Sequence, residues 1–178
     1  KEFDINKLFP KAILDKEHFK TVGDTIGKLP QLDSINKIKA KSDFHPLHYV
    51  PVSRPELYYW ISNTKPNCSA FENNECPNCH YISNTEDVFC EKCGKLLPKP
   101  TVQKDGEYRL IKGFVSTYKR MSNDEPAPTI TTRSAYACSD KNVHPTQNRV
   151  LSLYEVALLF GINPDDYNWK IKRDGKEV

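Results

Sequence analysis

Two Cys-x-x-Cys pairs constrain the fold of this chain more than any other feature of its sequence. Cys76 and Cys79 form the first pair, Cys90 and Cys93 form the second, and ten residues separate the pairs. A two-residue gap lets both sulfurs of a pair lie on one side of a tight turn, about 2.3 Å from a metal ion, and two such turns complete a tetrahedron. The spacing therefore predicts a zinc ribbon at about residues 70–98, with a structural zinc ion bound by these four cysteines.

The residues around the pairs support the ribbon. Gly94 follows the second pair and supplies the positive φ that such a turn needs, while Pro77 stiffens the first turn. The segment between the pairs is polar, so metal binding would provide most of the folding energy of this subregion. Three alternatives stay open: the cysteines could form two disulfides, they could be four unrelated buried residues, or His80 could replace one sulfur. The spacing also leaves open whether the ribbon is a structural staple or contacts nucleic acid.

Composition limits the kind of protein. The chain has 178 residues, of which 38% are hydrophobic and 13 are prolines, which predicts a loop-rich fold. It contains no run of about 18 apolar residues, and its amino terminus lacks the apolar core of a signal peptide. We therefore expect no membrane partner and a cytoplasmic protein. Reducing conditions there would leave Cys68 and Cys138 as free thiols.

Positive charge is concentrated in one stretch, residues 95–133. This stretch carries eight basic and four acidic residues, a net charge of +4, whereas the whole chain carries +3. Such a stretch favours an anionic partner, although a solvated face would explain it equally well.

Capping signals predict three helices. Thr21 with Asp24 begins a helix that should end near Lys28, and Ser53 with Glu56 begins one over about 54–62. A third capping box, Ser152 with Glu155, begins the last helix, in which Val156, Leu159 and Phe160 should form the buried stripe.

Alternation and β-branching predict three strands. Two lie within residues 107–120, with Gly113 as the turn or bulge between them, and Thr129–Thr132 forms the third.

Four stretches in a fixed order resemble the bacterial cytosine-5 DNA methyltransferases. They are TVGDTIGKLPQL (21–32), HPLHYVP with SRPELYYWI (45–61), YKRMSNDEPAPTITTRS (118–134) and HPTQNRVLSLYEVALLFGINPDDY (144–167). The third is similar to the ninth motif of the family and its lead-in, where Pro-x-x-Thr-Ile-Thr is characteristic. The middle of the chain, roughly 62–106, has no counterpart, as expected of the variable target recognition region with an inserted ribbon.

The chemistry-bearing motifs of that family are not found in these 178 residues. There is no Phe-x-Gly-x-Gly loop for S-adenosylmethionine, no Pro-Cys nucleophile and no Glu-Asn-Val. Asn67 precedes Cys68, and Ala137 precedes Cys138. The chain thus looks like the recognition fragment of a DNA (cytosine-5-)-methyltransferase. We expect it to contain no catalytic residue, to bind no S-adenosylmethionine and to be inactive alone, although the parent protein would be an enzyme that uses this cofactor.

The resemblance implies sequence-specific binding of double-stranded DNA, in partnership with a catalytic lobe of the same or a companion chain. Phosphate contacts are expected from residues around the PAPTITT segment: Lys119, Arg120, Thr129, Thr131, Thr132, Arg133 and Ser134. For the threonines, ordinary strand residues are the alternative. Possible base readers have donor or acceptor groups and lie in the loops before that segment: Gln103, Lys104, Arg109, Lys112 and Tyr118.

The predicted fold is α+β, a small irregular β-sheet target recognition domain with short helices and the inserted zinc ribbon. Residues 1–40 would be a linker with a short helix, 41–135 the target recognition domain, and 136–178 a C-terminal helical segment. Two other functions remain open: a free-standing zinc-ribbon module that binds protein or RNA, and a natural recognition subunit of a split restriction-modification methyltransferase.

Overall fold

Short elements joined by long loops build the chain, in keeping with its proline content. A computed structural model describes residues 15, 18–114, 116–139, 141–170, 172–173 and 176–177. The elements are α1 (Val22–Ile26), α2 (Pro55–Ser62), the 3-10 turn η3 (Ala70–Glu72), β1 (Thr101–Lys104), β2 (Glu107–Leu110), α3 (Leu153–Leu159), the 3-10 turn η4 (Pro164–Asp166), β3 (Lys172–Arg173) and β4 (Lys176–Glu177). In the described part, β1 pairs with β2 and β3 with β4, each pair antiparallel. The fold is thus α+β, as predicted.

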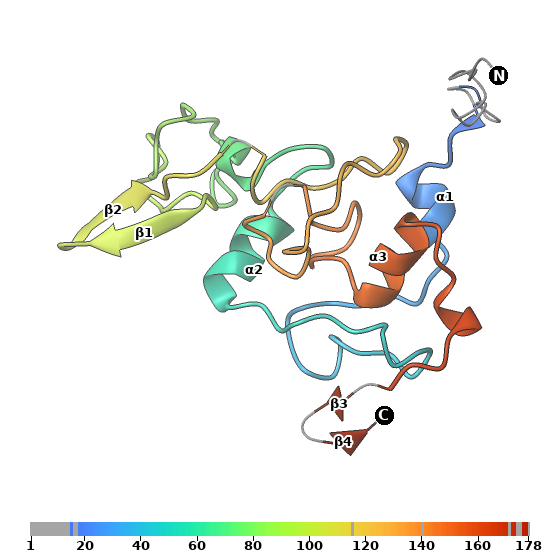
Figure 1. Cartoon of the computed structure of the whole chain (residues 1–178). Coiled ribbons are helices and arrows are strands. Elements are labelled where there is room, and N and C mark those ends of the chain that lie inside the picture. Colours follow the sequence, from blue (N-terminus) through green and yellow to red (C-terminus); the bar gives the residue numbers. More distant parts are fainter. Residues whose placement is uncertain are drawn as a thin grey trace, which may run out of the picture.

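The main core joins the two ends of the described chain. Val22 and Ile26 of α1 pack with Met121 and Leu151, and α1 lies beside α3 (Figure 1). Both helices begin as their capping boxes predict. The side chains of Thr21 and Ser152 accept from the backbone N–H groups of Asp24 and Glu155, whose carboxylates accept in return.

Two details of the predicted helices are wrong. Helix α2 lies where predicted, but Ser53 does not cap it: its hydroxyl donates to Ser34 Oγ at 2.8 Å, and Arg54 occupies the cap position without a side-chain hydrogen bond. Phe160 is 62% exposed, because α3 ends at Leu159 and Gly161 then turns the chain away with φ 75°.

A second, polar layer of the core is built on buried arginines. The Arg149 guanidinium donates to both carboxylate oxygens of Glu155 at 2.7 Å, and both side chains are fully buried. Arg120 donates at 2.5 to 2.8 Å to the carbonyl oxygens of Ile61, Thr64, His144 and Gln147 and to Asn148 Oδ1. It therefore ties the end of α2 to the loop before α3.

The predicted strands are largely wrong. Residues 107–110 do form a strand, but its partner is 101–104, so the turn is Asp105-Gly106 rather than Gly113. Both turn residues have positive φ, 54° and 84°, as a two-residue hairpin requires. Residues 129–132 form no strand, since no neighbouring segment pairs with them; Thr131 Oγ1 instead lies 3.1 Å from Ser139 Oγ.

The ribbon and the hairpin β1–β2 extend from one side of the helical body (Figure 1). No helix in the described part of the chain has the length and apolar character needed to cross a membrane. The domain boundaries at residues 40 and 135 stay a prediction.

Candidate metal centre and nucleic-acid interface

The two cysteine pairs lie in turns with the same backbone geometry. In the first, the N–H of Cys76 donates to Tyr81 O and that of His80 to Cys76 O, both at 2.9 Å. In the second, the N–H of Cys90 donates to Lys95 O and that of Gly94 to Cys90 O, both at 2.8 Å. A sequence with two Cys-x-x-Cys pairs therefore forms two equivalent knuckles.

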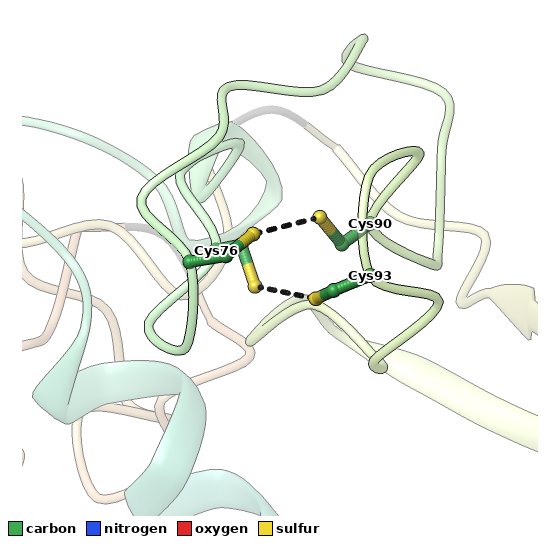
Figure 2. A group of neighbouring side chains, drawn as sticks. Cys76, Cys90 and Cys93 are labelled. Carbon is green, nitrogen blue, oxygen red and sulfur yellow. Dashed lines mark hydrogen bonds between the residues drawn. The ribbon is translucent and has the colours of Figure 1, made fainter.

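The four sulfurs converge on one point. All four Sγ atoms of Cys76, Cys79, Cys90 and Cys93 lie within 4.8 Å of one another. The Cys76–Cys93 and Cys79–Cys90 sulfur pairs are 3.6 and 3.5 Å apart, and Figure 2 shows the labelled side chains pointing toward a shared centre. A tetrahedron of sulfurs about 2.3 Å from zinc has edges of roughly 3.8 Å, so the donor set fits a zinc ion. A disulfide bond would be about 2.05 Å long, and all four cysteines are free.

Electrostatics at the knuckles favours a cation. The backbone N–H of Lys95 is the main reason that the pKa of Cys93 is lowered to about 6. The N–H of Tyr81 acts in the same direction on Cys79, but burial and the three neighbouring sulfurs outweigh it and raise the pKa of Cys79 to about 12. Four thiolates repel one another at this distance, and a divalent cation between them removes that repulsion.

His80 is not placed as a ligand. It occupies the position equivalent to Gly94, and both residues have positive φ, 57° and 68°. The His80 side chain is exposed, and its Nδ1 lies 3.3 Å from Glu75 Oε1. The alternative in which this histidine replaces one sulfur therefore has no support from the geometry.

A buried lysine closes the loop between the knuckles. Lys99 is fully buried, and its ammonium group donates at 2.9 Å to the carbonyl oxygens of Asn84, Thr85 and Asp87. Burial lowers the pKa of Lys99. Lys99 belongs to the basic stretch of residues 95–133, but its ammonium group is hydrogen-bonded inside the protein and is not available to a partner.

Three of the predicted base readers lie on the hairpin β1–β2, namely Gln103, Lys104 and Arg109. Gln103 pairs with Tyr108, and Lys104 pairs with Glu107. The first pair therefore lies on one face of the hairpin and the second pair on the other. Tyr108 packs edge to face on Phe89 of the second knuckle, with ring centroids 5.8 Å apart. Gln103 therefore shares the face turned to the second knuckle.

The other two predicted base readers lie outside the hairpin. Lys112 is exposed just beyond β2. Tyr118 is half-buried, with its ring packed against Trp60 and Phe71, and burial raises its pKa. Its φ is 52°, and its backbone N–H donates to Ala137 O. Tyr118 thus contributes to packing.

The structure separates the predicted phosphate contacts by exposure. Thr129, Thr131, Thr132 and Arg133 are exposed and Lys119 is half-buried, whereas Ser134 is buried. Arg120 is only 4% exposed, and its donors are committed to protein acceptors. It is therefore a core residue and is not available for the predicted phosphate contact.

Sequence reasoning missed the hairpin face that carries Val102 and Glu107 beside Lys104 and Arg109. The signal was present, because Asp105-Gly106 between two alternating runs is typical of a two-residue β-turn. It also missed Asn73, whose side-chain amide donates to Pro98 O and Trp60 O at 2.6 and 2.9 Å. No motif identifies such a contact.

Comparison with curated proteins finds a match along most of this chain. The Type II methyltransferase M1.HgaI of Avibacterium volantium is 32% identical over 172 residues, which cover 92% of this chain and 39% of the relative. The chain is homologous to part of a Type II methyltransferase. This confirms the resemblance to methyltransferases drawn from the four sequence stretches. The chain spans about two-fifths of the length of that relative. No family profile matches the chain, and no solved structure does.

Proposed function

We propose that this chain is the target recognition part of a DNA cytosine-5 methyltransferase of restriction-modification type. The observation that carries the proposal is the match to a Type II methyltransferase along nearly the whole chain. The four stretches, and the PAPTITT segment above all, supply the cytosine-5 assignment. In this proposal the chain holds duplex DNA in register while a catalytic lobe methylates the target base.

The chemistry belongs to the catalytic lobe. A cytosine-5 methyltransferase needs an activated thiolate and a site for S-adenosylmethionine, and neither motif is found in these residues. S-adenosylmethionine supplies the methyl group when it is bound in the lobe that carries those motifs. The residues of this chain bind and orient DNA.

Zinc is the metal that we propose for the four cysteines. Bound there, it supplies no chemistry beyond holding the two knuckles together, because all four positions of the tetrahedron are occupied by protein sulfurs. The ribbon is thus a structural support for the segment that follows it.

Phosphate contacts are proposed for the exposed residues near PAPTITT. Arg133 is exposed, and its guanidinium has no hydrogen-bond or ion-pair partner among the described residues. Thr129 and Thr132 offer exposed hydroxyl groups beside it, and Lys119 and Thr131 complete the set. Such contacts fix the position of a protein on DNA without reading its sequence.

A competition experiment tests the proposal. The zinc-loaded chain is bound to a labelled random-sequence duplex, and unlabelled duplex or single-stranded RNA is added. We expect affinity for the duplex on the order of 10⁻⁴ to 10⁻⁶ M at physiological salt, because the contacts of the catalytic lobe are not present. Duplex should compete better than RNA. Preference for the RNA would favour the zinc-ribbon module that binds RNA, and absence of duplex binding at low salt would refute the recognition function.

A further inference from the structure

The hairpin β1–β2 is an exposed arm with one unoccupied face. All residues from Val102 to Arg109 are exposed, and the strands project from the body beyond the ribbon (Figure 1). Val102 pairs with Arg109 and Lys104 with Glu107, so these four side chains share the face opposite Tyr108. Within the described residues, the side chains of Lys104, Glu107 and Arg109 make no hydrogen bond or ion pair.

This lack of partners sets Arg109 apart from the buried arginines. Arg120 and Arg149 donate to protein acceptors on all sides. Arg109 has the same fork of donors and none of them is used by the described residues. The diagonal neighbour Lys104 adds a second positive charge on the same face, where Glu107 lies opposite it. Two positive charges against one negative charge leave the face suited to an anionic partner with hydrogen-bond acceptors.

The base of the arm is rigid. Pro98 and Pro100 fix the backbone that enters β1, and Lys99 between them is anchored by three carbonyl oxygens of the ribbon loop. The N–H of Ile111 donates to Pro100 O at 2.9 Å and closes the base of the hairpin. Contact between Tyr108 and Phe89 supports the arm from the side of the ribbon. These contacts join the base of the arm to the segment that carries the two cysteine knuckles.

We infer that this arm enters the major groove of DNA and that the face of Val102, Lys104, Glu107 and Arg109 reads the base edges; this inference rests on the proposed function. The major groove is about 12 Å wide and admits a two-stranded β-ribbon. Each strand has four residues, which makes the arm roughly 14 Å long at about 3.4 Å per residue, enough to reach the groove floor at about 8.5 Å.

The chemistry of the four side chains suits base reading. Arg109 donates two parallel hydrogen bonds to guanine O6 and N7, and Lys104 can donate to the same acceptors. Glu107 accepts from the N4 amino group of cytosine, while Val102 offers an apolar contact to the thymine methyl group. A carboxylate on this face would weaken plain phosphate binding, so Glu107 favours a role in base discrimination.

Selection from a duplex pool with a randomised central segment tests the inference. The zinc-loaded chain is compared with Arg109→Ala and Arg109→Lys. Wild type should select guanine at one or more positions. Arg109→Ala should reduce that preference by roughly 5- to 150-fold, as expected for one bidentate contact. Arg109→Lys should reduce it too, because the charge stays but the fork is lost.

Two matched variants serve as controls. Gln103→Ala tests the competing prediction that Gln103, on the opposite face of the same arm, reads a base, and Lys92→Ala removes one exposed charge from the second knuckle. Neither should change the selected sequence. Zinc content and the melting curve of each variant verify folding.

The outcomes separate the inference from the proposed function. Duplex binding with the same selected bases in wild type and Arg109→Ala would overturn the inference and leave DNA recognition standing. A changed preference in Gln103→Ala with none in Arg109→Ala would also overturn it, because the reading face would be the wrong one. A chain that binds duplex DNA but selects no sequence contradicts it as well, and failure to bind duplex at all would refute both.

Discussion

Arg120 and Arg133 stand thirteen positions apart in one basic stretch, yet their guanidinium groups face different surroundings. The first donates to five protein acceptors in the core, and the second is exposed. Burial lowers the pKa of Arg120 to about 10, so it stays charged at neutral pH. We expect Arg120→Ala to lower the free energy of unfolding by roughly 3–5 kcal/mol, because several buried carbonyl groups lose their donor.

Denaturant unfolding measures this difference. Arg133→Ala is the matched control and should unfold like wild type, within about 0.5 kcal/mol. Equal stability of the two variants would contradict the assignment of Arg120 to the core.

Equivalent positions of the two knuckles allow a paired prediction. His80 and Gly94 both have positive φ. In this conformation backbone strain costs a residue with a Cβ atom about 1 kcal/mol, whereas glycine has no such strain. No atom lies within 4 Å of a Cβ added at Gly94, so backbone strain alone should act there. We expect His80→Gly to raise the thermal stability of the zinc-loaded ribbon and Gly94→Ala to lower it by a similar amount. Changes of the same sign in both variants would contradict the equivalence.

We expect His144 to make the stability of the chain sensitive to acid. Its Nδ1 accepts from the backbone N–H groups of Thr146 and Gln147, and its Nε2 lies 3.7 Å from Glu155 Oε1. Burial first, and the charge of Arg149 second, lower the pKa of His144 to about 3. A folded-state pKa below the unfolded value of about 6.5 means that stability is full above pH 6.5 and falls, by up to about 1.4 kcal/mol per pH unit, as pH decreases.

His144→Asn tests this pH dependence, because an amide oxygen can accept the same two N–H groups without titrating. The variant should lose the decline in unfolding free energy between pH 6.5 and about 4.5, above the range in which carboxylates titrate. Both proteins contain the same ribbon, so loss of metal in acid cancels in the comparison. Parallel pH profiles would contradict the role of His144.

At the scale of elements, zinc should hold the ribbon and direct the hairpin arm. We expect about one zinc per chain, lost in Cys90→Ser and on treatment with a chelator. Amide exchange should then rise across the ribbon and at the base of the hairpin, while α1 and α3 stay protected, because their core contains no ribbon residue. Protein purified without chelator that contains no metal would contradict the zinc assignment.

Local signals predicted some elements correctly and failed for others. Thr21 with Asp24 and Ser152 with Glu155 identified two helix starts, because a capping box is complete within four residues. Ser53 failed as a cap because Ser34, nineteen positions away, takes its hydroxyl group. The strand expected at 129–132 failed because β-branched residues form a strand only where a partner segment lies alongside.

At the scale of the whole molecule, the sequence predicted the cysteine cluster but not which basic residues are exposed to solvent and which are buried. The four cysteines lie close in sequence and their spacing decides their geometry. The burial of Lys99 and Arg120 depends on contacts with segments 12 to 59 positions away. Such contacts follow from the tertiary fold, which no local pattern encodes.

The chain by itself should transfer no methyl group. We expect no tritium in DNA after incubation of the purified chain with labelled S-adenosylmethionine, and no binding of that cofactor by calorimetry, because the motifs for both are not found here. A full-length relative serves as the positive control. Labelled DNA from protein free of host enzymes would contradict the division of roles between recognition and chemistry.

Salt dependence of duplex binding tests the recognition function most directly. Fluorescence anisotropy of a labelled duplex is titrated with wild type, Arg133→Ala and Lys92→Ala over a series of salt concentrations. Affinity should fall steeply with salt, and Arg133→Ala should flatten the slope of log K against log salt by about 0.9, the value for one phosphate contact. Lys92→Ala should leave the slope unchanged. Binding of wild type that ignores salt, or equal slopes in all three proteins, would contradict the account.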